Sequence, residues 1–185
     1  MLIFIKNLAD KNDVDRLKDY LTQLNYCVEG DIYLGEVHLR GIRTGAEIMK
    51  LGMQLQEEGF EVLFDRKHII CEQVKMVVKE MLAEEKRPRE NYSAYISKRI
   101  YRNYTYLANI FSEINGITIE HYIINEKIEH AKKLLLHPDN SIGKVADLVH
   151  YSSIGYFSNQ FKKLTGLSPS EFKRMYSLEG NTHLS

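Results

Sequence analysis

The chain has 185 residues, of which 44% are hydrophobic and 27% charged, enough apolar content for one or two packed domains. No apolar run approaches the length of a membrane span, and we expect no signal peptide. These features argue against membrane and secreted classes, so we expect a cytoplasmic protein that does not contact a membrane.

The net charge is zero overall but differs between the two halves of the chain. Residues 1–90 carry 14 Lys/Arg against 17 Asp/Glu, whereas residues 91–185 carry 11 against 8, a net charge of +3. A basic second half fits a polyanionic partner, although so small an excess is weak support by itself.

The first 64 residues alternate between strand and helix patterns and predict an α+β domain over residues 1–68. The expected elements are a strand at 2–5, a helix at 13–24, strands at 26–34 and 36–40, a helix at 44–58 and a strand at 60–64. This βαββαβ order is that of a ferredoxin-like domain.

The same order resembles the heavy-metal-associated domain of copper carriers, which holds its metal through a Cys-x-x-Cys pair in the loop after the first strand. Here that loop, 7–13, contains no cysteine, so we expect neither a metal site nor a cofactor. Cys27 and Cys71 stand far apart without a motif and are expected to be free buried thiols, and His38 and His68 surface or core residues. Ligand sensing, partner binding and dimerisation all remain open for this domain.

Apolar residues at helical spacing predict a helix over 69–85 that carries the chain onward. The charged segment 84–91, EEKRPREN, contains Pro88 and is the best linker candidate. We therefore assign 69–90 as connecting helix and linker, 91–178 as a second, all-α domain, and 179–185 as a tail.

The second domain opens with predicted helices at 92–100, 105–114 and 118–136. Thr118 is expected to cap the last of these, and Pro138 stops it. Three shorter helices follow, at about 142–149, 153–165 and from Pro169 onward. Ser141 is the expected first cap, Gly166 a left-handed C-terminal residue, and Ser168 begins a capping box.

The helix at 153–165 has one apolar stripe, formed by Ile154, Phe157, Phe161 and Leu164. A helix, a tight turn and a second helix form the geometry that presents the second helix to the DNA major groove. Its opposite face carries Asn159, which can pair with an adenine edge, and lysines that suit phosphate oxygens. An ordinary solvated amphipathic helix is the alternative.

This region resembles the C-terminal DNA-binding domain of AraC/XylS-family transcription regulators over residues 91–178. The residues that carry the resemblance are Ser141-Ile142, Val145-Ala146, Tyr151-Ser152-Ser153, Tyr156-Phe157-Ser158, Phe161-Lys162-Lys163, Gly166, Ser168-Pro169 and Phe172-Lys173. Upstream, Leu107, Phe111, Gly116, Tyr122, Lys127-Ile128, Ala131 and Leu134-Leu135 fit the first half of the same domain. The resemblance implies a sequence-specific regulator that binds double-stranded DNA, and it leaves contact with RNA polymerase and a homodimer open.

Eight residues are predicted to contact DNA through the two helix-turn-helix motifs of such a domain. The base contacts are Tyr156, Ser158 and Asn159 on helix 153–165 and Asn109 on helix 105–114. The phosphate contacts are Ser153, Lys162, Lys163 and Lys173. If about four phosphates are neutralised, log affinity falls with log salt at a slope near −3.6.

Two departures from the family pattern concern the turns. The family places a short helix between the opening helix and 105–114, but only about four residues lie there, and Glu113 would repel phosphate. We therefore expect the first motif to serve mainly as a scaffold. His150 stands where the family has a left-handed glycine, so replacing it with Gly is expected to leave the melting temperature unchanged or higher.

Two other function classes remain. The chain is alternatively a ligand- or protein-binding module that has lost DNA reading. An enzyme is the weakest option, since no phosphate-binding loop, paired carboxylates or nucleophile–base spacing occurs, and we predict no catalytic residues.

Overall fold

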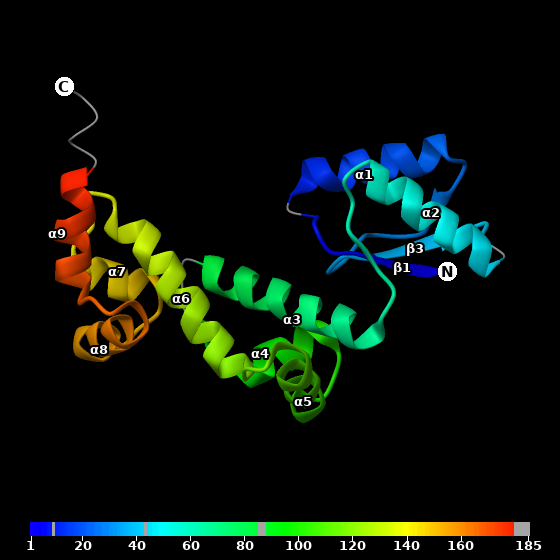
Figure 1. The fold of residues 1–185 in the computed structure, drawn as a ribbon. Coiled ribbons are helices and arrows are strands. Elements are labelled where there is room, and N and C mark those ends of the chain that lie inside the picture. The colour runs from blue at the N-terminus through cyan, green and yellow to red at the C-terminus, as the bar shows by residue number, and fades with distance from the viewer. Residues whose placement is uncertain (9, 43, 85–87, 180–185) are drawn as a thin grey trace, which may run out of the picture. The chain divides into compact units, whose positions relative to one another are not determined.

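The computed structural model describes residues 1–8, 10–42, 44–84 and 88–179, with side chains described to residue 176. The chain divides into two compact units (Figure 1). The first comprises residues 1–77 and 105–115, and the second comprises 78–104 together with the residues from 116 onward. Among the described residues, no helix is both long and apolar enough to span a bilayer.

The first unit contains a small sheet and the helices around it. Its elements are β1 (Leu2–Ile5), α1 (Lys11–Gln23), β2 (Cys27–Val28), β3 (Glu36–Arg40), α2 (Gly45–Glu57), β4 (Val62–Leu63), most of α3 (Arg66–Ala83) and nearly all of α5 (Tyr104–Asn115). The first six follow one another in the predicted order of strands and helices.

The sheet has the strand order β2-β3-β1-β4, with every neighbouring pair antiparallel. Asp10 caps α1, and a capping box of Thr44 and Glu47 opens α2. The two helices pack on the sheet around one apolar core. That core consists of Ile3, Ile5, Leu17, Leu21, Val37, Leu39, Leu51, Leu55 and Phe60.

Two strands are shorter than predicted. The pattern over 26–34 predicts one strand, but β2 ends at Val28 because the backbone turns left-handed at Gly30 (φ 73°), and a single bridge joins Tyr33 to Glu36. β4 also pairs over two residues only, and Phe64 beyond it is 56% exposed. Alternating apolar residues therefore overstated the length of both edge strands.

The two cysteines have different environments. Both are free thiols, but Cys27 is exposed, contrary to the prediction that both are buried. Cys71 is buried on α3, its Sγ lies 3.8 Å from the Ile110 carbonyl oxygen, and burial raises the pKa of this thiol. Cys71 thus links α3 to α5 within the first unit.

The division between the two units falls within α3, after residue 77, and the predicted linker belongs to the second unit. Helix α3 begins at Arg66, where Asp65 accepts from the His68 amide at 3.0 Å, and its last residues lie in the second unit with α4 (Tyr92–Ile100). Tyr95 of α4 donates to the Glu84 carboxylate at 2.6 Å, and Arg99 pairs with Glu80 at 2.8 Å. Segment 84–91 therefore joins two contacting helices, although its residues 85–87 lie outside the described part of the chain.

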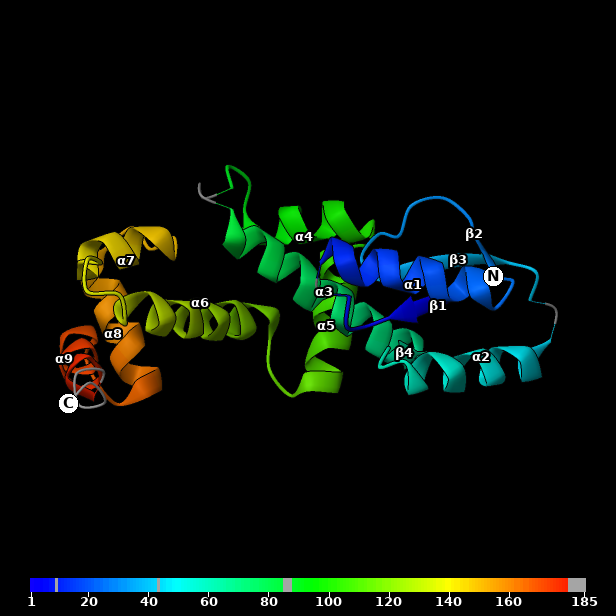
Figure 2. The same ribbon diagram turned by 90° about the horizontal axis from the view of Figure 1, so that it is seen from above.

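The rest of the second unit is helical. It contains α6 (Ile119–Leu135), α7 (Ile142–Leu148), α8 (Ile154–Thr165) and α9 (Pro169–Glu179). Helices α7, α8 and α9 gather around the C-terminal half of α6 (Figures 1 and 2). Their shared core consists of Ile128, Ala131, Leu135, Val145, Ala146, Val149, Tyr151, Phe157 and Phe161.

Candidate nucleic-acid interface

The turn between α7 and α8 is built around His150. Its φ of 61° confirms the predicted left-handed conformation, and its amide donates to the Asp147 carbonyl at 2.9 Å. The His150 carbonyl accepts from the Lys127 ammonium at 3.1 Å, and the buried ring places Nε2 3.1 Å from the Glu84 carbonyl oxygen. The turn is therefore tied to α6 and to the end of α3, which the sequence pattern did not indicate.

Helix α8 is capped at both ends, at Gly166 as predicted and at Ser153, which the sequence suggests only as a phosphate contact. Ser153 accepts from the Tyr156 amide at 3.4 Å, and Gly166 closes the helix at φ 81°. The capping box of Ser168 and Glu171 then starts α9, and the hydrogen bonds from Ser168 hold the pKa of the Glu171 carboxyl below its usual range. These caps fix where α8 begins and ends.

Aromatic packing holds the inner face of α8. Phe157 and Phe161 are fully buried, and their rings contact each other and those of Tyr151 and Phe172. The predicted stripe was wrong at its ends, because Ile154 is 54% and Leu164 39% exposed. One pair of residues four apart is thus enough to seat the helix on the core.

The outer face of α8 carries most of the predicted DNA contacts. Asn159, Lys162 and Lys163 are exposed, and Ser158 is half-buried at the edge of that face. Tyr156 is exposed on the first turn, where its hydroxyl accepts from Gln160 Nε2 at 3.2 Å. Gln160 thus bonds to Tyr156, a role that the sequence did not reveal.

Lys173 differs from the other predicted phosphate contacts. Its ammonium donates to the Pro138 carbonyl at 2.9 Å and to the Asn140 carbonyl at 2.6 Å. These bonds tie α9 to the turn after α6. The structure therefore gives Lys173 an internal role, and we do not retain it as a phosphate contact.

Helix α5 presents different chemistry. Asn109 is exposed on it, but the helix has no Lys or Arg, and Glu113 pairs with Lys67 of α3 at 2.5 Å. Two helices, α3 and α4, precede α5, whereas the sequence pattern assigned the first of them to the connecting segment. The helix that looked missing from the family pattern is accounted for if α3 is the opening helix and α4 the short one.

Residues that could hold a metal do not cluster in the described part of the chain, where no group of three or more His, Cys, Asp or Glu side chains comes together. The outer face of α8 instead offers hydrogen-bond donors and acceptors beside positive charge. This chemistry suits base edges and phosphates.

Residues 96–175 match the family described as a helix-turn-helix domain. One curated relative, the bifunctional transcriptional activator/DNA repair enzyme AdaA of Bacillus subtilis, is 38% identical over 69 residues, which cover 37% of this chain and 33% of that protein. The HTH-type transcriptional regulator YisR of Bacillus subtilis is 23% identical over 170 residues, 92% of this chain and 56% of that protein. The matches thus span from a third to little more than half of these two relatives.

Solved structures show the same fold. One is a transcriptional regulator from Chromobacterium violaceum whose description places it among the AraC-type DNA-binding domain-containing proteins. It superposes with a TM-score of 0.50 at 19% identity, and the match covers 56% of this chain and 91% of that one. The DNA-binding domain of AdpA, solved in complex with a target DNA, gives a TM-score of 0.51 at 17% identity, covering 64% and 99%. Residues 96–175 of this chain therefore form a helix-turn-helix domain with the AraC-type fold.

Proposed function

We propose that this chain is a sequence-specific DNA-binding transcription regulator that reads the major groove with α8. The observation that carries the proposal is the exposed edge of Asn159, Lys162 and Lys163 on a helix whose opposite face is locked by Phe157 and Phe161. A rigid helix with one amide and two ammonium groups on its free face can place a base contact and phosphate contacts at once.

The comparisons support this role. The relatives described above are named as transcriptional regulators or activators, and AdpA was solved with a target DNA. AdaA also carries the name of a DNA repair enzyme, but the match covers only 33% of it. We therefore propose a regulator without enzymatic activity of its own, acting in the cytoplasm through RNA polymerase.

Each retained residue has a distinct proposed contact. Asn159 pairs with an adenine edge, and Ser158 and Tyr156 contact neighbouring bases or sugars. Lys162 and Lys163 neutralise phosphates, and the Ser153 hydroxyl lies at the N-terminus of α8, where backbone amides also favour phosphate. Asn109 is the one base contact proposed for α5.

For the first unit we propose a ferredoxin-like domain related to heavy-metal-associated domains but without metal binding. The antiparallel order β2-β3-β1-β4 supports the fold assignment. In the loop after β1, Asn7 donates to the Gly59 carbonyl at 2.7 Å and accepts from the Glu61 amide at 2.8 Å. An amide bridge thus braces the loop that carries thiolates in copper carriers, and ligand sensing or pairing of two copies is the role we propose for this unit.

The salt dependence of duplex binding tests the proposal. Because Lys173 is not retained, about two phosphates are neutralised, and log affinity of the wild type against log salt should have a slope near −1.8. Lys162→Ala with Lys163→Ala should bring this slope close to zero. The matched control replaces Lys11 and Lys50, two exposed lysines of the first unit, and should leave the slope unchanged.

Two results would contradict the proposal. An unchanged slope in the Lys162/Lys163 variant would remove α8 from the interface. Absence of binding to every duplex at low salt would instead favour a ligand- or protein-binding module that has lost DNA reading.

A further inference from the structure

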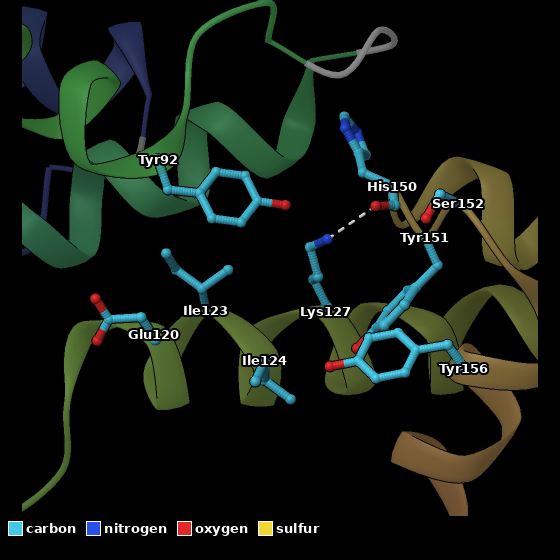
Figure 3. A pocket seen from close by; sticks show the side chains of 9 residues that line it. All are labelled: Tyr92, Glu120, Ile123, Ile124, Lys127, His150, Tyr151, Ser152 and Tyr156. Carbon is cyan, nitrogen blue, oxygen red and sulfur yellow. Dashed lines mark hydrogen bonds between the residues drawn. The ribbon is translucent and has the colours of Figure 1, made fainter.

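A cavity of about 270 Å³ lies within the second unit, beside the turn that precedes α8 (Figure 3). Ile123 and Ile124 of α6 form its apolar floor, and Tyr92, Tyr151 and Tyr156 supply aromatic walls. A cavity of this size fits a small molecule with a single ring system. The proposed DNA contacts do not account for it, apart from Tyr156.

A buried cation stands in the wall of this cavity. Lys127 is only 5% exposed, and its Nζ lies 4.7 Å from the ring centroid of Tyr151 and 5.4 Å from that of Tyr92. The ring faces and the His150 carbonyl, which accepts from Nζ at 3.1 Å, offset the cost of burying an ammonium. A positive charge in an apolar cavity attracts an anionic group more strongly than it would in water.

The hydroxyl of Tyr151 supplies a second polar group. The residue is 8% exposed, and its hydroxyl oxygen is buried without a hydrogen-bond partner among the described residues. Burial raises the pKa of Tyr151 to about 12, so the group keeps its proton and can donate. Buried hydroxyls are normally satisfied, so an unpartnered one in a cavity wall marks a place where the acceptor group of a ligand would fit.

We propose that this cavity binds a small aromatic carboxylate. The carboxylate accepts from the Lys127 ammonium and the Tyr151 hydroxyl, while the ring lies on Ile123 and Ile124 between the tyrosine side chains. Glu120 sets the orientation of the ligand in the cavity. It lies seven residues before Lys127 on α6, about 10 Å away along the helix, and so marks the opposite end of the cavity. Its carboxylate accepts from Tyr104 and would repel an anion placed at that end.

Tyr156 packs against Tyr151 at the polar end of the cavity, so a ligand that reaches the buried Tyr151 hydroxyl displaces Tyr156. Its ring lies in front of that of Tyr151 in Figure 3, with the two ring centroids 5.7 Å apart. Because Tyr156 is 56% exposed, it can turn aside without disturbing the core. Ligand binding therefore repositions the side chain that we propose as a contact on the first turn of α8.

A coupling between ligand binding and duplex binding follows from this movement of Tyr156, and it rests on the proposed function. If the ligand turns Tyr156 away from its DNA-contacting position, ligand and duplex compete for one side-chain orientation. Saturating ligand should then weaken duplex binding, and duplex should weaken ligand binding by the same factor. The turn of the second motif would thus carry an effector site inside the DNA-binding domain itself.

Indole-3-acetate is a suitable probe because the chain contains no tryptophan. Indole fluorescence, excited beyond the tyrosine band, then reports the ligand alone when it is titrated with the full chain. We expect saturable binding with a Kd below about 1 mM, and binding of the uncharged indole-3-acetamide at least about tenfold weaker. No saturation by indole-3-acetate, or equal binding of the amide, would overturn the proposal.

Tyr151→Phe tests the orphan hydroxyl without emptying the core. We expect indole-3-acetate affinity to fall about tenfold, as for loss of one hydrogen bond to a charged group. The melting temperature should not fall, because the variant removes an unsatisfied buried group. Tyr176→Phe, on α9, is the matched control and should bind as the wild type does. Equal affinity of Tyr151→Phe and wild type would remove the hydroxyl from the site.

Duplex affinity measured with and without the probe separates the two proposals. Weaker duplex binding at saturating indole-3-acetate supports the coupling, whereas unchanged duplex affinity overturns it and leaves the ligand site standing. Should the chain bind no duplex, the proposed function fails while the fluorescence titration still decides the ligand site.

Discussion

Helices α5 and α8 follow the turns of the two helix-turn-helix motifs, yet they offer DNA different surfaces. The exposed side of α8 carries Asn159 with Lys162 and Lys163, whereas α5 carries Asn109 and a carboxylate, Glu113, that is paired with Lys67. Phosphate contacts supply most of the affinity of such domains, and base contacts supply the specificity. Only α8 combines both kinds of group.

The comparison indicates that two helices can be packed through similar apolar faces and still differ in what they offer to DNA. Buried residues Leu107, Ile110 and Phe111 seat α5 just as Phe157 and Phe161 seat α8. Both helices therefore bury an apolar inner face, and they differ in the polar groups of their outer faces. We propose that α5 acts chiefly as a scaffold and α8 as the reading helix.

Asn159→Ala should give the largest effect on recognition. Loss of a bidentate amide contact costs on the order of 1 to 3 kcal/mol at one base pair and relaxes the preference there. Competition titrations with duplexes that differ at single positions measure this loss. Equal weakening on all sequences would show that Asn159 contacts only the DNA backbone.

His150→Gly should lower stability, in contrast to the expectation from sequence. Glycine relieves the left-handed strain, worth about 1 kcal/mol, but the variant loses a buried ring and the hydrogen bond from the ring to Glu84. We expect a net fall of about 1 to 2 kcal/mol in the free energy of unfolding. Urea unfolding with His150→Asn as a control, which also tolerates this conformation, separates the strain from the packing. A higher melting temperature in the glycine variant would mean that strain outweighs the ring.

Tyr104→Phe probes the anchor at the start of α5. The Tyr104 hydroxyl donates to Glu120 and holds the pKa of that carboxyl below its usual range. Stability from a depressed carboxyl pKa is present above the unfolded value of about 4.5 and is lost as pH falls through the folded pKa. At this exposed site the variant should therefore cost at most about 1 kcal/mol at pH 7, and the difference from wild type should shrink in acid. Urea unfolding of both proteins at pH 7 and in acid provides the measurement. A difference in the free energy of unfolding that grows in acid would contradict the account.

Glu113→Gln should give the smallest effect. An exposed ion pair such as that with Lys67 contributes about 0 to 1 kcal/mol to stability. If α5 is a scaffold away from phosphates, duplex affinity should change less than about twofold when the negative charge is removed. A large gain in affinity would place α5 against the DNA backbone and end the distinction between the two helices.

Features set by neighbouring residues were predictable from sequence. The caps at Thr118 and Ser141, the left-handed Gly166 and the left-handed His150 all depend on positions within a few residues of one another. Each was predicted and each is present. Helix periodicity likewise located α4, α6 and α8 to within a residue or two.

Features that join distant segments were not predictable. Lys173 contacts carbonyls 33 and 35 residues away, and Lys127 meets the His150 carbonyl across 23 residues. A lysine in a sequence carries no sign of whether its ammonium will meet solvent, phosphate or a buried carbonyl. The cavity beside Tyr151 was missed for the same reason, since its walls come from α4, α6, the turn and α8.

Selection from a randomised duplex pool at moderate salt, with wild type, Asn159→Ala and Asn109→Ala in parallel, tests the division between the two helices most directly. We predict an enriched motif for the wild type, altered at one or two positions by Asn159→Ala and unchanged by Asn109→Ala. A motif that Asn159→Ala leaves intact, or that Asn109→Ala alters, would contradict the assignment of base reading to α8.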